Sequence, residues 1–149
     1  MDYYIYGLSS LRILNLSNCY LKQIQQIGSL KNLEDLDISL NEQVKIDSLS
    51  QLIKLKELNI SWNKQMDIAP LKNLVGLIKL ILCSCGIRSI SVLKHLINLQ
   101  FLDLSDKQFR YFRATVFKAE PNLFKIEQMQ LSVNLCFKST SKSIISKFS

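Results

Sequence analysis

The sequence lacks several features that would place it in familiar functional classes. No apolar run approaches the ~18 residues that a transmembrane helix needs. With only four glycines, the chain has no glycine-rich loop for binding phosphate. The single histidine, His95, has no matched nucleophile, so a Ser-His-Asp triad is not expected. These absences argue against an enzyme and against an integral membrane protein.

The cysteines are few and poorly spaced for cross-linking or for metal binding. The four cysteines are Cys19, Cys83, Cys85 and Cys136. Their positions do not suggest a disulfide framework, and the types and spacings of the possible ligands do not match a metal site. We expect free thiols, no metal and no cofactor. The N-terminal residues also lack the basic start and apolar stretch of a signal peptide. Together these features predict a cytoplasmic location.

The sequence does contain one motif that repeats every 22 residues. It reads "LRILNLSNC" from Leu11, "LEDLDISLN" from Leu33, "LKELNISWN" from Leu55, "LIKLILCSC" from Leu77 and "LQFLDLSDK" from Leu99, with a weaker sixth copy, "PNLFKIEQM", from Pro121. The alternation of Leu14 and Leu16 with Ile13, Asn15 and Ser17 predicts a short strand with one buried face. The apolar spacing of three that follows predicts a tight turn or a short 3₁₀ segment, and Ser48 and Pro70 stand where such segments would start.

These copies resemble the leucine-rich repeat family, in the 22-residue class known from the regulatory subunit of protein phosphatase 1 and from bacterial internalins. The resemblance covers roughly residues 2–131. It implies an α/β fold, a right-handed solenoid with a curved parallel sheet on its concave face and short helical or turn segments on its convex face. It also implies that Asn41 and Asn63 point into the coil and bond to loop backbone, and that Cys19 and Cys85 are accepted replacements at that position.

The repeat pattern divides the chain into a solenoid over residues 1–131 and a basic, Ser/Lys-rich tail over residues 132–149. Gln43 and Gln65 occupy positions that are usually apolar. They predict either a hydrogen-bonded pair or a local shift by one residue, since Val44 and Met66 follow them. The chain starts partway through a coil, which leaves a terminal cap, a longer array and end-to-end self-association as open alternatives.

Residues that point outward from the predicted strands form columns across the coils. They place an acidic cluster, Asp35, Asp37 and Glu57, beside the only tryptophan, Trp62. We interpret this face as a binding surface for another protein with a basic surface, rather than for a small molecule. The alternative is a merely solvated sheet face. The candidate contacts are Asp35, Asp37, Glu57, Asn59, Trp62, Lys79, Phe101 and Asp103.

The predicted sheet is open and shallow, so we expect no pocket that would raise the pKa of one carboxylate for catalysis. The net charge of +7 is concentrated at residues 107–149, which hold eight Lys or Arg and two Asp or Glu. Two alternative functions therefore remain. One is a regulatory subunit of a phosphatase, and the other is attachment to nucleic acid or to an anionic membrane through the basic C-terminal region, although a solvated terminus is the more common reading.

Overall fold

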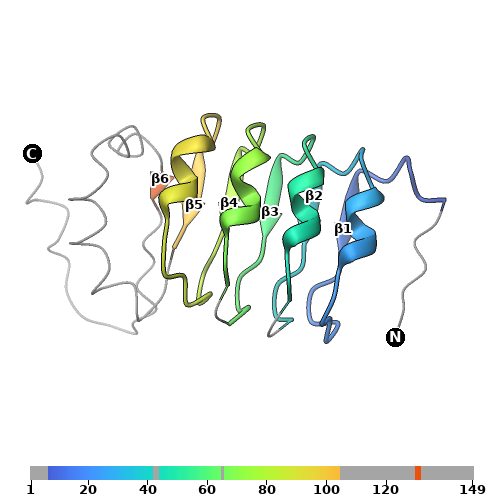
Figure 1. Cartoon of the computed structure of the whole chain (residues 1–149), viewed down its shortest axis with the longest axis horizontal. Coiled ribbons are helices and arrows are strands. Elements are labelled where there is room, and N and C mark those ends of the chain that lie inside the picture. Colours follow the sequence, from blue (N-terminus) through green and yellow to red (C-terminus); the bar gives the residue numbers. More distant parts are fainter. Residues whose placement is uncertain (1–6, 42–43, 65, 105–129, 132–149) are drawn as a thin grey trace, which may run out of the picture.

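The chain forms a stack of similar coils, seen side by side in Figure 1. The computed structural model describes residues 7–41, 44–64, 66–104 and 130–131. The strands are β1 (Ile13–Asn15), β2 (Asp35–Asp37), β3 (Glu57–Asn59), β4 (Lys79–Ile81), β5 (Phe101–Asp103) and β6 (Gln130–Leu131). The 3₁₀ helices are η1 (Gln25–Ser29), η2 (Asp47–Gln51), η3 (Ala69–Asn73) and η4 (Ser91–His95).

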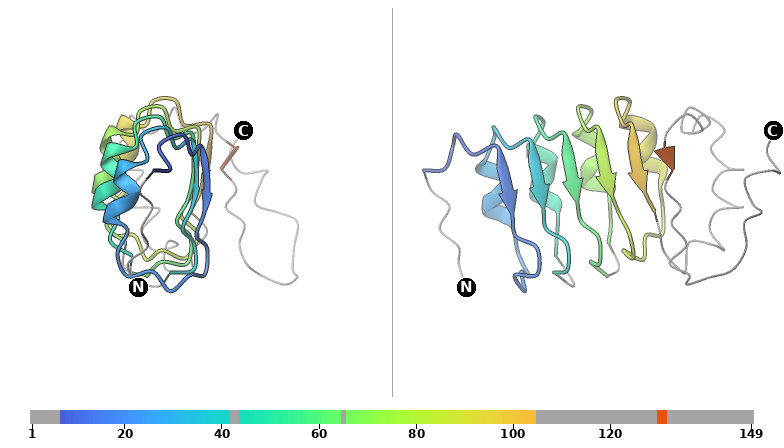
Figure 2. Two further views of the ribbon diagram at one scale, coloured as in Figure 1. Left: turned by 90° about the vertical axis from the view of Figure 1, so that its right-hand side faces the viewer. Right: turned by 180° about the vertical axis from the view of Figure 1, so that it is seen from behind.

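All strands pair in parallel and in chain order, from β1 to β6. The register from β1 to β5 advances by 22 residues each time, so that Ile13 pairs with Asp35, which pairs with Glu57. Seen end-on, the strands form one side of a flattened ring and the 3₁₀ helices form the other (Figure 2). The predicted leucine-rich repeat solenoid is therefore confirmed.

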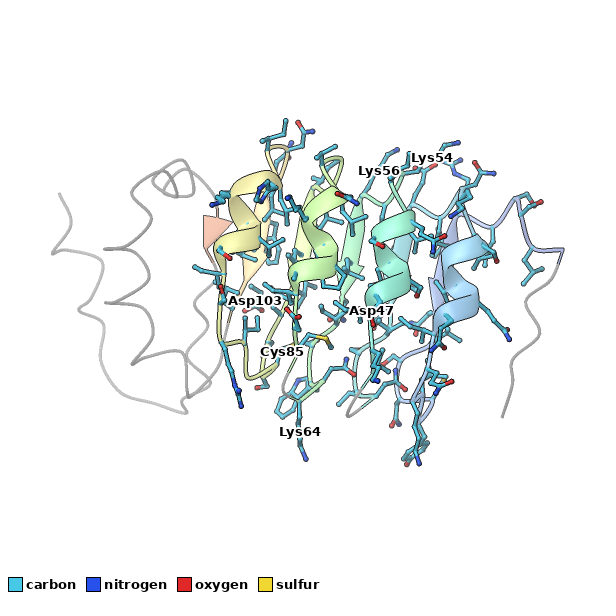
Figure 3. The ribbon with its side chains drawn as sticks, in the orientation of Figure 1. Asp47, Lys54, Lys56, Lys64, Cys85 and Asp103 are labelled. Atoms are coloured by element: carbon cyan, nitrogen blue, oxygen red, sulfur yellow. The ribbon has the colours of Figure 1, made fainter. Side chains whose placement is uncertain are left out.

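Two rows of loops connect these sides and are named here by their place in Figure 1. The upper edge holds the loops that lead from each 3₁₀ helix to the next strand. The lower edge holds the loops that lead from each strand to the next 3₁₀ helix. Lys54 and Lys56 lie on the upper edge and Lys64 lies on the lower edge (Figure 3).

The 3₁₀ segments follow directly from the apolar spacing of three. A 3₁₀ helix has three residues per turn, so residues three apart share one face. Ile24, Ile27 and Leu30 are all buried, and their backbones are linked by bonds from Ile27 N–H to the Ile24 carbonyl and from Leu30 N–H to the Ile27 carbonyl. The same arrangement recurs around η2, η3 and η4.

The two residues expected to start these segments act in different ways. Pro70 lies in the first turn of η3, where a backbone N–H has no partner within the helix. Ser48 lies in the first turn of η2, but its hydroxyl donates to the Ile24 carbonyl of the preceding coil at 2.9 Å. Ser48 therefore ties two coils together and does not cap its own helix.

The core is one continuous column of leucine and isoleucine from coil to coil. Val44 and Met66 are buried in it, which agrees with the alternative of a one-residue shift in the second and third coils. Gln43 and Gln65 themselves lie outside the described residues. The shift keeps an apolar side chain against the core where the 22-residue register would place an amide, and burying an unpaired amide is costly.

The sixth strand departs from the 22-residue register. β6 pairs Gln130 with Phe101, a separation of 29 residues. The sixth copy that starts at Pro121 would instead place Leu123 opposite Phe101. That copy lacks the full leucine pattern that fixes the register of the other five. The tail at 132–149 lies outside the described residues, so the boundary of the solenoid stays a prediction.

Buried asparagines, Asn41 and Asn63, connect two loops of the lower edge to their own coil and to the preceding one. The Asn41 Oδ1 atom accepts bonds from the N–H groups of Cys19, at 3.0 Å, and Leu21, at 2.9 Å. Its Nδ2 group donates to the carbonyls of Leu16, at 2.8 Å, and Ile38, at 2.9 Å. One side chain thus satisfies backbone groups that the turn leaves without partners.

Cys85, which occupies the asparagine position in its coil, makes only part of these hydrogen bonds. Asn63 Nδ2 donates to the carbonyls of Ile38 and Ile60 at 3.0 and 2.9 Å, and the thiol of Cys85 donates to the Ile60 carbonyl at 3.1 Å. A thiol provides one weak donor and cannot match the acceptor role of an amide oxygen. The inward orientation implied by the family resemblance is confirmed for Asn41, Asn63 and Cys85.

We expect Asn41→Ala to lower the free energy of unfolding by about 3 kcal/mol, because several buried backbone groups lose their partner at once. Asn41→Cys should lower it by only about 1–2 kcal/mol, since the thiol retains a donor. Urea unfolding followed by circular dichroism measures both values. Equal losses for the two variants would show that the side-chain donor contributes nothing.

Candidate protein-binding face

The outward side of the sheet is hollowed across β1 to β4. The hollow has a volume of about 330 Å³ and is open to solvent. Five of the candidate residues line it: Asp35, Asp37, Glu57, Asn59 and Lys79. The sequence analysis missed that Ile13, Asn15 and Ile81 line the same hollow. The outward columns of the repeat contain these three residues, so the periodicity itself was the signal that would have found them.

Asp37 and Asn59 have structural roles in this face. Asp37 Oδ1 accepts a bond from the Ser39 N–H at 2.9 Å, and Asp37 Oδ2 accepts one from Asn59 Nδ2 at 3.0 Å. Asn59 Oδ1 accepts in turn from the Ser61 N–H at 3.1 Å. Each side chain therefore caps the backbone two residues further on, which explains why poor strand formers occupy these strands.

Asp35 has no such bond and lies half-buried between other acidic groups. Burial raises the pKa of Asp35, and the neighbouring carboxylate of Glu57 raises it further, while the ammonium group of Lys79 lowers it. The expectation of an open, shallow sheet without a pocket to raise the pKa of one carboxylate did not anticipate this shift. Its first cause is the partial burial of the Asp35 side chain. The hollow is nevertheless open, so it does not exclude water as an acid–base site would.

Lys79 links the acidic side of the hollow to the aromatic side chain of β5. Its Nζ atom lies 3.1 Å from Glu57 Oε2 and 6.0 Å from the centre of the Phe101 ring. Asp103 lies next to Ile81 by the pairing of β4 with β5, at the margin of the hollow. Lys79 thus lies between the acidic groups of β2 and β3 and the Phe101 ring of β5.

Trp62 lies outside the hollow, in the loop that follows β3. Its side chain is 55% exposed, and its backbone adopts the left-handed conformation with φ 59°. Leu40, which the sequence analysis did not select, holds the equivalent place after β2, with 46% exposure and φ 58°. Asn18 and Ser84 have the same conformation in the flanking coils. Two large apolar side chains are therefore presented side by side where two coils use small polar ones.

The Trp62 and Leu40 backbones are fixed by bonds to the next coil. Leu40 N–H donates to the Ser61 carbonyl at 2.9 Å, and Trp62 N–H donates to the Cys83 carbonyl at 2.8 Å. The left-handed conformation costs a non-glycine residue about 1–2 kcal/mol. Asparagine, as at Asn18, tolerates this conformation better than leucine or tryptophan does.

At the start of the strands, on the upper edge, three charged residues form a chain across neighbouring coils. Glu34 receives Arg12 Nε at 2.7 Å on one carboxylate oxygen and Lys56 Nζ at 2.6 Å on the other. The bond from Arg12, followed by that from Lys56, lowers the pKa of Glu34 to about 2. The pKa of Asp35 in the hollow is thus raised, whereas the pKa of the paired carboxylate of Glu34 is lowered.

The structure offers no metal-binding cluster in the residues it describes, where no three potential ligands come together. No disulfide bond joins Cys19, Cys83 or Cys85 in the described part of the chain, and Cys136 lies outside the described range. None of the helices in the described part of the chain has both the length and the apolar character that crossing a membrane requires.

Comparison with known proteins supports the fold. A profile of the family described as "Leucine Rich Repeat" matches residues 10–30. Among solved structures, internalin C2 of Listeria monocytogenes is similar with a TM-score of 0.64 and 35% identity over 67% of this chain and 44% of its own. No match is found among curated proteins.

Two further internalin structures are similar. The internalin inlF of Listeria monocytogenes has a TM-score of 0.60 and 24% identity over 74% of this chain and 34% of its own. The functional domain of InlJ from the same species, which includes a cysteine ladder, has a TM-score of 0.58 and 28% identity over 64% of this chain and 21% of its own. This chain therefore matches less than half of the length of each of these three structures.

The chain is a leucine-rich repeat protein, and its solenoid is structurally similar to the repeat domains of Listeria internalins. Domains of this fold generally mediate protein–protein interactions and are typically non-catalytic. The eight candidate contact residues remain a prediction, as do the phosphatase alternative and the cytoplasmic location.

The paired carboxylate predicts how stability depends on pH. The folded pKa of Glu34, about 2, lies below the ordinary value of 4.5, so its contribution to the free energy of unfolding is complete above about pH 5. It is lost as the pH falls toward about 2. We expect Glu34→Gln to lose less stability than the wild type between about pH 6 and pH 2.5, as measured by urea unfolding.

Salt provides the control for this experiment. Because Arg12 and Lys56 are exposed, about 1 M NaCl should screen their attraction for Glu34 and reduce the difference between the two proteins. Parallel curves of stability against pH at low salt would show that the ion pairs do not lower the pKa of Glu34.

Proposed function

We propose that this chain is a non-catalytic binding module that holds a basic segment of another protein against its sheet face. Leu40 and Trp62 carry this proposal. They are half-exposed, and their backbones adopt a conformation that neither residue favours. Residues that cost stability and lie at the surface are typical of binding sites, and tryptophan is enriched among the residues that dominate interface energies.

The charges of the hollow indicate the chemistry of the partner. Asp35 and Glu57 lie near each other, and the raised pKa of Asp35 reflects burial and repulsion between carboxylates. A lysine or arginine of a partner placed between them would relieve that repulsion. Complementary charge would also favour basic partners and speed their encounter.

The apolar groups would anchor the same partner beside this charge. Leu40 and Trp62 follow β2 and β3, the two strands that carry Asp35 and Glu57. A segment that crosses these strands toward the lower edge would meet carboxylates first and the apolar pair next. We infer that the partner carries a basic residue close to a large apolar one. The lack of a disulfide bond at Cys19 is compatible with the proposed cytoplasmic location.

A pair of matched variants tests the proposal. Trp62→Asn with Asp35→Asn should reduce capture of the partner from a cell lysate at least ten-fold, which corresponds to about 1.4 kcal/mol. The melting temperature should not fall, because asparagine tolerates the left-handed conformation and the substitution removes an ionised group that burial disfavours. Quantitative mass spectrometry of the captured proteins and a thermal melt measure both effects.

The control makes the same chemical changes elsewhere. Tyr20→Asn with Asp47→Asn removes an exposed aromatic residue with φ 55° and a carboxylate of η2, neither of which lines the hollow. This control should capture the partner as the wild type does. Equal capture by both double variants would rule out the sheet face as the binding site.

A further inference from the structure

The upper edge carries a row of exposed aliphatic side chains that belongs to neither the core nor the sheet face. Ile53, Val75 and Ile97 are 64%, 48% and 78% exposed and are separated by 22 residues each. Each lies in the turn that follows a 3₁₀ helix, and the loops that contain these turns form the upper edge (Figure 1). The equivalent positions of the earlier coils hold Ser9 and Lys31, so the apolar row is confined to one end of the edge.

The loops that carry this row are packed against one another. A side-chain carbon placed on Gly76 would lie 3.6 Å from the Ile53 carbonyl oxygen, which is ordinary van der Waals contact, so the two loops lie next to each other. Asn98 Nδ2 donates to the Val75 carbonyl at 2.8 Å and connects the next pair. Adjacent parallel strands lie about 4.8 Å apart, so the three side chains form a short, fixed line.

Lysines surround this line on both sides. Lys54 follows Ile53 directly and lies on the upper edge in Figure 3. Lys72 and Lys94 lie in the last turns of η3 and η4, just before Val75 and Ile97. Among the described residues of this edge the one carboxylate is Glu34, which Arg12 and Lys56 already neutralise.

We propose that the upper edge docks onto the surface of an anionic lipid membrane. The aliphatic row enters the region between the headgroups, and the surrounding lysines contact their negative charges. Lysine suits this place because its apolar stem can follow the inserted residues while its ammonium group stays at the headgroups. Each lysine near an anionic bilayer adds to the attraction, and the inserted side chains add hydrophobic burial.

The shape and composition of the edge favour a membrane over other partners. The row consists of exposed side chains in successive turns, so a protein partner would need a surface that matches their spacing, whereas a fluid bilayer adapts to it. Nucleic acid would be attracted by the lysines but would gain little from aliphatic side chains, since single strands stack on aromatic rings. This surface is separate from the sheet face and does not depend on the function proposed above.

The test measures binding of the full-length protein to vesicles. Vesicles of phosphatidylcholine with about one-third phosphatidylserine are compared with pure phosphatidylcholine by co-sedimentation. We expect binding to the anionic vesicles only, and a partition coefficient at least ten-fold lower for Ile53→Ser/Val75→Ser/Ile97→Ser. Because this triple variant keeps every charge, including the basic residues 107–149, its loss of binding isolates the aliphatic row.

Two matched sets of charge variants identify which lysines contribute to vesicle binding. Lys54→Glu/Lys72→Glu/Lys94→Glu should abolish binding, while Lys22→Glu/Lys45→Glu/Lys64→Glu, on the lower edge, should retain most of it despite the same change in net charge. A Tyr20→Ser variant, which removes a larger exposed apolar side chain from the lower edge, should bind as the wild type does. Circular dichroism spectra confirm that all variants are folded.

Several results would overturn the proposal. Unchanged vesicle binding by the triple serine variant would assign binding to the charges of the C-terminal region. Binding to a short DNA duplex that is as tight as binding to the anionic vesicles, and insensitive to the serine substitutions, would indicate a nucleic-acid surface. A dimer that the serine substitutions dissociate would show that the row is an interface between two copies. Absence of binding to any vesicle would also refute it.

Discussion

The stacking of one coil on the next is the interaction on which the whole structure depends. A single coil has a strand of three residues and a 3₁₀ helix of five, too little to bury its own leucines. Burial is complete only when the next coil covers them, and this requires the strands to pair in a fixed register. The buried asparagines enforce the same register from the loops, because Asn41 bonds to the backbone of two coils at once.

This fixed register turns each outward position into a column, and the columns separate the charges of the molecule. The sheet face gathers Asp35, Asp37 and Glu57, whereas the upper edge gathers lysines around an aliphatic row. The two surfaces lie on different sides of each coil. Electrostatic complementarity favours a basic partner for the sheet face and an anionic partner for the upper edge. Both surfaces can be tested with variants that leave the core intact.

The fold could be predicted closely from the sequence because the constant repeat length defines the register in which the strands pair. Five copies at a constant spacing fixed the strands β1 to β5, and the spacing of three fixed the 3₁₀ helices. The sixth strand was misplaced because its copy is too degenerate to define a register. For the site, the outward columns identified the acidic cluster, but they did not distinguish Asp37, which caps its own backbone, from Asp35, which does not.

The sequence by itself determined the architecture, since periodic burial of leucine leaves one way for the coils to stack. Only the tertiary structure decided the state of individual side chains. The raised pKa of Asp35 depends on how deeply the stacked strands bury it. The exposure of Leu40, Trp62 and the aliphatic row depends on backbone conformation and on which edge a loop occupies. Periodicity marks which residues face the core, but the surroundings of an outward residue come from neighbouring coils that lie at least 22 residues away in the chain.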